Sequence, residues 1–98
     1  SPWQPVLSQG TIEIFVLGPL AVKGEFVLTR QELRLRTYGS LVTKIFGAVD
    51  LKLSVEDNVQ IADGSTQQKL GVRHGGGTVW VGGKKAAVMH FFLNQLKG

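Results

Sequence analysis

The sequence predicts a mainly β domain: a bent antiparallel sheet or partly open barrel of seven strands, capped by one C-terminal α-helix. Three observations support this fold class. Short runs of alternating apolar and polar residues recur between turn residues along most of the chain. The final segment instead carries apolar residues at helical spacing. Thirteen glycines suit a strongly bent sheet, because tight corners favour residues without a β-carbon.

The first three strands form a predicted meander. They are expected at residues 10–17, 21–29 and 33–38. Gly18 and Pro19 end the first strand, since proline cannot continue a hydrogen-bonded ladder and glycine supplies turn geometry. Gly24 interrupts the second strand and indicates either a bulge or the close approach of another segment.

Four further strands follow a longer connection over residues 39–47. The fourth strand is expected at residues 48–53, with Val49, Leu51 and Leu53 facing inward. The remaining strands are expected at residues 59–61, 69–73 and 78–81, after turns at 57–58, 63–66 and 75–77.

The residue pattern predicts a single clear α-helix, at residues 84–97. Its apolar residues form a broad stripe at helical spacing, made of Val88, Met89, Phe92, Leu93 and Leu96. Gly98 is expected to end the helix, because a left-handed residue is common at that position.

No pattern typical of an enzyme or a cofactor site is present. Gly83 and Lys84 resemble part of a phosphate-binding loop, but that motif requires glycine where Thr78 stands and a hydroxyl residue after the lysine. His74 and His90 lack acidic or histidine neighbours at metal-ligand spacing. A serine-nucleophile motif is also missing. We therefore expect no catalytic residue, no metal, no cofactor and no small-molecule substrate.

Length, charge and cysteine content narrow the function classes further. Residues 1–98 are expected to form a single domain cut from a larger protein, since Ser1, Pro2 and Trp3 do not resemble a natural start. Trp3 belongs either to an edge strand or to an ordered tail. The lack of cysteine excludes disulfides, a thiol nucleophile and thiolate metal sites. No apolar run approaches the roughly 20 residues of a membrane helix. The net charge of +4 favours anionic partners only mildly.

Four stretches stand in a recognisable order along nearly the whole chain. They are GTI at residues 10–12, EFVLTRQELRL at 25–35, GAVDLKL at 47–53 and TVWVGGKKAAVMHFFLNQL at 78–96. They resemble the first strand, the second-to-third hairpin, the fourth strand, and the seventh strand with the C-terminal helix of pleckstrin-homology domains. The resemblance implies a partly open barrel of seven strands, plugged at one end by the helix. Phe92 stands where that family normally carries tryptophan.

The same resemblance implies where a phosphoinositide headgroup would bind, but basic residues are missing there. The family's position in the first strand falls on Ile14, and its Lys-x-Arg pair in the second strand falls on Val22 and Gly24. Lys23 lies between the latter two and should point to the opposite face of the strand. The loop at residues 18–21 is short and apolar. Specific, tight lipid binding is therefore disfavoured.

We expect a non-catalytic interaction or targeting module of an intracellular signalling or scaffold protein, located in the cytoplasm and acting mainly through a partner protein. Candidate contact residues are Leu41, Val42, Phe46 and Phe91. If exposed, these residues and Ile45 form an interaction patch; if buried, they complete the barrel. The sequence leaves both readings open.

Two alternatives remain. The first is a peripheral-membrane module with weak, salt-sensitive affinity for phosphoinositides or other anionic lipids. Its weak candidate residues are Lys23, Arg34, Arg36, Lys44, Lys84 and Lys85. The second and least favoured is a small barrel that binds single-stranded nucleic acid, with bases stacked on Tyr38, Phe46 or Trp80.

Overall fold

Seven antiparallel strands form one sheet in the computed structural model, which describes residues 5–98. The strands are β1 (Ser8–Leu17), β2 (Leu20–Leu28), β3 (Glu32–Thr37), β4 (Asp50–Ser54), β5 (Gln60–Ile61), β6 (Lys69–His74) and β7 (Gly77–Gly82). They pair in the order β4-β3-β2-β1-β7-β6-β5, so β4 and β5 are the edges of a sheet that does not close. The helices of the described residues are α1 (Leu41–Phe46), α2 (Val55–Asn58) and α3 (Lys84–Lys97). The predicted fold class is confirmed, while Trp3 lies outside the described residues.

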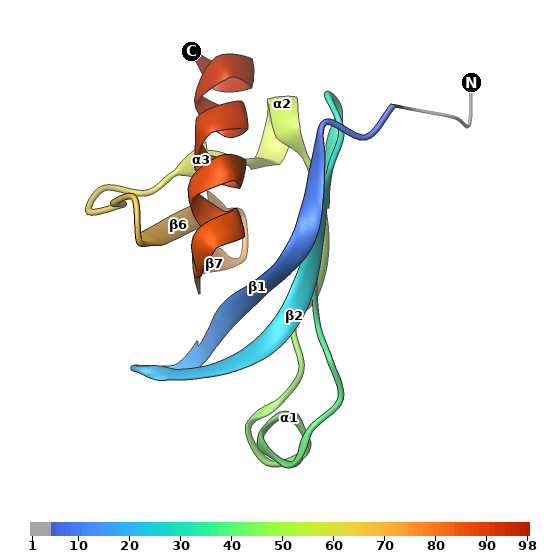
Figure 1. Cartoon of the computed structure of the whole chain (residues 1–98), viewed down its shortest axis with the longest axis vertical. Helices are drawn as coiled ribbons and strands as arrows, with labels where there is room; N and C mark the ends of the chain where they lie inside the picture. The colour runs from blue at the N-terminus through green and yellow to red at the C-terminus, as the bar shows by residue number, and fades with distance from the viewer. Residues whose placement is uncertain (1–4) are drawn as a thin grey trace.

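In Figure 1, α3 lies over β6 and β7 and on the concave side of the curved β1–β2 ribbon. The helix contacts β1, β5, β6 and β7. Met89 and Leu93 are fully buried in this position, and Phe92 and Leu96 pack partly buried against the core. Complete burial of Met89 or Leu93 contributes about 1.5–3 kcal/mol each.

One residue of the predicted helical stripe lies outside it. Val88 is 40% exposed, whereas Ala86, two residues closer to the start of α3, is 1% exposed. The inward face of the helix is therefore rotated slightly from the predicted one. The predicted end of the helix is confirmed, because the N–H of Gly98 donates to the carbonyl of Asn94 at 2.7 Å.

The strands bury alternate residues, as the sequence pattern predicts. In β3, for example, Leu33 and Leu35 are fully buried while Arg34 and Arg36 are exposed. The buried residues of the sheet include Ile12, Ile14, Phe26, Leu28, Leu53, Leu70, Val72, Val79 and Val81. Val49 and Leu51 pack partly buried against this core, so the predicted inward face around β4 is also correct.

Gly24 allows β3 to approach β2 closely. A β-carbon at Gly24 would lie 2.4 Å from the carbonyl oxygen of Arg36, which is an impossible contact. The pairing of β1 with β2 is regular at Gly24 and shifts instead between Phe15 and Leu17. Of the two predicted explanations for this glycine, the close approach is therefore the correct one.

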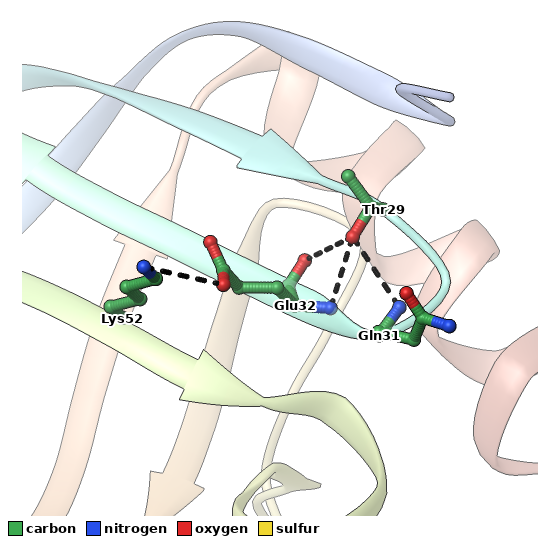
Figure 2. A network of polar contacts seen from close by, with 4 residues as sticks. All are labelled: Thr29, Gln31, Glu32 and Lys52. Carbon is green, nitrogen blue, oxygen red and sulfur yellow. Dashed lines mark hydrogen bonds and ion pairs between the residues drawn. The ribbon is translucent and has the colours of Figure 1, made fainter. Parts of the chain in front are cut away.

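The β2–β3 turn is closed by the side chain of Thr29 (Figure 2). Its Oγ1 accepts hydrogen bonds from the N–H groups of Gln31 and Glu32, at 3.3 and 3.0 Å. The same hydroxyl donates to the carbonyl of Glu32 at 3.4 Å. These bonds fix the register in which β3, beginning at Glu32, pairs with β2.

Two short helices replace segments that the sequence analysis treated as irregular. Residues 41–46 of the long connection form α1, and the expected turn at Asp57 and Asn58 is the second half of α2. Both helices begin at a serine whose hydroxyl accepts a hydrogen bond from the N–H three residues later. At six and four residues they are too short to show a helical period in the sequence.

Candidate interaction surfaces at the open end of the sheet

Helix α1 is held in shape by its caps. The hydroxyl of Ser40 accepts a hydrogen bond from the N–H of Thr43 at 3.2 Å, and Thr43 Oγ1 accepts one from the N–H of Ser40 at 2.9 Å. Gly47, with φ 97°, ends the helix, and its N–H donates to the carbonyl of Thr43 at 3.0 Å. Local side-chain bonds therefore define a helix that propensity alone would not stabilise.

Thr37 and Val49 close the base of the loop that carries α1. The N–H of Thr37 donates to the carbonyl of Val49 at 2.9 Å. The N–H of Val49 donates in return to Thr37 Oγ1 at 3.0 Å. Only 8% of Thr37 is exposed, so these bonds are shielded from water. The loop thus leaves the sheet at a fixed point and in a fixed direction.

The apolar residues of α1 face solvent. Leu41 is 72% exposed, Ile45 is 65% exposed and Phe46 is 51% exposed, whereas Val42 is half-buried. The alternative that the sequence left open is thereby decided: most of these side chains do not complete the barrel. Lys44 is also exposed on the same short helix. We call Leu41, Ile45 and Phe46 the α1 patch.

The β1–β2 turn lies at the same end of the molecule as α1, opposite α2 and the C-terminus (Figure 1). Leu17, which precedes this turn, is 57% exposed, and Gly18 adopts a φ of 53° to make the turn. Helix α1 contacts β1. The apolar surface of this end therefore extends from the α1 patch towards the tip of the first hairpin.

An open cleft of about 380 Å³ separates β4 from the β6–β7 hairpin. Its lining is mainly apolar and comes from β1, β7 and the segment that enters β4, comprising Phe15, Val16, Ala48, Val49, Leu51 and Val79. Asp50, His74 and Thr78 are the polar residues of the lining. The cleft borders β4, which is an edge strand of the open sheet.

Among the predicted basic residues, Arg34 and Arg36 line a common shallow hollow of about 220 Å³ with Glu25 and Val27. Arg36 forms an ion pair with Glu25. The Arg36 side chain also donates a hydrogen bond to the Glu25 carboxylate. This bond and the charge of Glu25 raise the pKa of Arg36, and the charge of Asp50 adds to the effect. One of the two arginines is therefore already neutralised within the sheet.

The other predicted basic residues lie on different elements. Lys23 is exposed on β2, opposite Glu13 of β1. Lys84 and Lys85 are exposed at the start of α3, and a β-carbon on Gly10 would lie 3.0 Å from the Lys85 side chain. Lys85 therefore covers part of β1. These three residues and Lys44 come from three separate elements, β2, α3 and α1.

The positions that the family resemblance assigns to headgroup binding are occupied by core residues. Ile14 is fully buried, Val22 is 8% exposed, and Gly24 is also buried. Lys23 points away from them, as predicted from strand alternation. None of these three buried residues can supply charge or hydrogen bonds from its side chain to a phosphate.

Phe91 forms a second exposed apolar site, on α3. It is 59% exposed and makes an edge-to-face contact with Phe92, with ring centroids 5.5 Å apart. Val88 precedes it by one turn on the same exposed face. Phe91 therefore belongs to a surface of the helix rather than to the α1 patch.

Trp80 lies on the outer face of the sheet and is half-buried. A β-carbon on Gly71 would lie 2.8 Å from the Trp80 ring, so the indole covers that glycine. Lys69 Nζ lies 4.3 Å from the ring centroid of Phe15 and 5.5 Å from that of Trp80. Because Lys69 covers these rings, they are poorly placed to stack with nucleic-acid bases. Tyr38 is 40% exposed, beside the loop that carries α1.

Residues 5–98 contain no group of three or more His, Cys, Asp or Glu side chains that could hold a metal ion. Within the same residues, no helix is long and apolar enough to span a membrane.

Three features were not predicted from the sequence: the exposure of Leu17, the cleft and the helical form of residues 41–46. The last of these had a local signal, because serine, present at position 40, is a preferred residue at the start of a helix. The exposure of Leu17 and the cleft depend on how distant strands are arranged, and no local pattern in the sequence reports that.

Comparison with known proteins gives a structural neighbour but no family assignment. No protein-family model and no curated protein sequence matches the chain. The fold is similar to the crystal structure of the C-terminal domain of an unknown protein from Leishmania infantum, with a TM-score of 0.65 and 9% identity. The match covers 97% of this chain and 86% of that one. At this identity the similarity shows a shared fold only.

Proposed function

We propose that this chain is a non-catalytic interaction module that binds a partner protein through the α1 patch. The observation that carries the proposal is the exposure of Leu41, Ile45 and Phe46 on a helix fixed by its own caps. Large apolar side chains gathered in this way mark interaction sites more often than isolated exposed ones do. The caps lower the entropy cost of binding, because the patch is ordered before the partner arrives.

The assignment to the pleckstrin-homology-like superfamily is part of this proposal. Its support is the chain order of seven strands followed by a C-terminal helix, together with the four sequence stretches that resemble the family. Cytoplasmic location and a place in a signalling or scaffold protein belong to the same proposal. Cell fractionation of the tagged full-length protein checks the location.

Protein contact is favoured over membrane contact by the charges around the patch. Lys44 is the one basic residue within α1, whereas the residues at the headgroup positions, Ile14, Val22 and Gly24, are buried and uncharged. A basic residue near an anionic membrane contributes about 1 kcal/mol, so one lysine adds little to membrane affinity. Apolar side chains supply most of the contact energy that this end of the molecule offers.

The test compares the chain with a double variant, Ile45→Ser with Phe46→Ser, in affinity purification from cell extract with quantitative mass spectrometry. Val88→Ser is the matched control, because Val88 is an exposed apolar residue of α3. We expect a partner that the native chain and the control retain, and that the double variant loses by about tenfold or more. A partner retained equally by all three proteins would contradict the proposal.

One observation favours the membrane alternative: Lys44 lies among the apolar residues of α1. Co-sedimentation with phosphatidylcholine vesicles, with and without phosphatidylserine or phosphoinositide, tests it. Binding that requires the anionic lipid, weakens with salt and is reduced by Lys44→Glu would favour a peripheral-membrane module. We expect no such binding at physiological salt.

A further inference from the structure

β4 is an edge strand with unused backbone groups. A backbone hydrogen bond extends the pairing of β4 with β3 at each end. The N–H of Thr37 donates to the carbonyl of Val49, and the N–H of Val55 donates to the carbonyl of Gln31. In an antiparallel pair, directly opposed residues alternate between hydrogen-bonded and non-hydrogen-bonded pairs. The N–H and C=O groups of Asp50 and Lys52 therefore point away from β3, towards the free edge. An edge of this kind is a template for a further strand.

The charges beside this edge are unbalanced. Lys52 lies directly opposite Arg34 in a non-hydrogen-bonded pair, where side chains come closest. Like charges in this arrangement destabilise a sheet. The only ion pair of Lys52 within the described residues is a 3.8 Å contact with Glu32 (Figure 2), and Arg34 has no ion pair there. The next set of directly opposed residues across β2, β3 and β4 has its charges balanced, because Arg36 lies between Glu25 and Asp50.

The other face of the same edge is mainly apolar. Val49 and Leu51, which flank Asp50, line the open cleft together with Val16 and Val79. Side chains of an added strand would alternate between the two faces of the sheet. A residue on the outer face would lie beside Lys52 and Arg34, and its neighbours on the inner face would lie at the cleft.

We propose that the free edge of β4 binds an extended segment of a partner protein in which one acidic side chain, placed beside Lys52, is flanked by apolar ones. The segment adds a strand by main-chain hydrogen bonds to Asp50 and Lys52. Its carboxylate neutralises Lys52 and Arg34, and its apolar side chains enter the cleft beside Val49 and Leu51. The charge complementarity selects this partner, because an acidic segment removes a repulsion that the free domain carries.

Two other occupants can be distinguished from a partner segment. A second copy of this chain paired edge to edge would place Asp50 of one copy opposite Lys52 of the other in one register, and Lys52 opposite Lys52 in another, so self-association is measured directly. A lipid or nucleic-acid phosphate has no peptide groups to pair with the strand edge. The site is separate from the α1 patch, so this proposal and the function proposed above can fail independently.

Nuclear magnetic resonance titration with a capped peptide of about seven residues tests the proposal; the peptide has a central glutamate, valine on either side of it and threonine at the other outward positions. We expect the largest amide shifts, and new protection from hydrogen exchange, at Asp50 and Lys52. The same peptide with one backbone N-methyl group at the pairing position should bind about tenfold more weakly, because it loses a main-chain hydrogen bond. A peptide in which lysine replaces glutamate should not bind.

Variants of the domain separate charge from backbone pairing. Lys52→Glu and Arg34→Ala should each weaken binding of the native peptide by about threefold or more. Lys84→Glu is the control with the same charge change at the exposed start of α3, and it should leave affinity unchanged. Equal binding of the N-methylated and unmodified peptides would overturn the proposal, as would protection confined to another element. Self-association through β4, seen in sedimentation equilibrium, would overturn it as well.

Discussion

Lys97 Nζ, at the end of α3, donates a 2.8 Å hydrogen bond to the backbone carbonyl of Val55 in α2. It also donates to the carbonyl of Glu56 at 3.1 Å. A cation at this place satisfies carbonyl groups that a four-residue helix leaves without partners. The last residues of the chain thereby hold the segment that links β4 to β5.

Replacing Lys97 by methionine should weaken this link, because methionine preserves much of the aliphatic chain and removes the donors. We expect the free energy of unfolding to fall by about 0.5–1.5 kcal/mol, as for the loss of an ordinary hydrogen bond. Urea denaturation followed by circular dichroism measures the change. Lys84→Met, at the exposed start of the same helix, is the control and should change stability little.

Gly24→Ala should destabilise the domain by about 1–3 kcal/mol, because the new methyl group would overlap the carbonyl of Arg36 and push β3 away from β2. The comparison variant is Gly39→Ala, since a β-carbon there meets no atom within 4 Å. Thermal unfolding of both variants checks the prediction. Equal melting temperatures for the two variants would show that β3 can move without cost.

Ser40→Ala should remove the N-terminal cap of α1 and cost about 1 kcal/mol of local stability. We expect faster hydrogen exchange of the α1 amides and weaker binding at the α1 patch. Ser40→Asn retains a capping side chain and should behave much like the native chain. If alanine and asparagine gave the same exchange rates, the cap would not be what orders this helix.

The ion pair between Arg36 and Glu25 should contribute equally to stability at neutral and at moderately alkaline pH. The pKa of Arg36 is higher in the folded protein than in the unfolded chain. The ion pair therefore contributes its full stabilisation at every pH below the pKa of arginine in the unfolded chain. That stabilisation is lost only as the pH rises through the higher pKa of the folded state. The stability difference between the native chain and Glu25→Gln should therefore be the same at about pH 7 and about pH 10. Urea titrations at both values check this, and a difference that shrank at the higher pH would contradict it.

The elements that could be predicted from sequence are those that carry their own signals. The helix at Lys84–Lys97 was predicted with its exact bounds, because a glycine flanks each end of an apolar stripe. Strands such as β3 were predicted to within a residue, because burial alternates along them and turn residues bound them. The predicted burial of Val88 was wrong. The sequence shows which residues form an apolar stripe, but packing against the sheet determines which side of that stripe is buried.

The candidate surfaces were predictable only in part. Leu41 and Phe46 were identified as apolar residues of a connection, but their exposure follows from bonds between Thr37 and Val49 that set where the loop leaves the sheet. The unused edge of β4 depends on the strand order of the whole sheet. Neither property is local in the sequence, so neither could be assigned before the fold was known.

The two parts of the sheet are joined by β1 and β7, which come from opposite ends of the chain and pair over Glu13–Gly82, Ile14–Val81 and Phe15–Trp80. The β1–β4 meander can form from neighbouring segments, but this junction requires closure of a loop that includes most of the protein. On a ribosome, the junction can form only after residue 82 has emerged from the exit tunnel, and the complete α3 only after residue 97. Until then β1 has no partner on one side, which makes the nascent chain prone to aggregation at that strand.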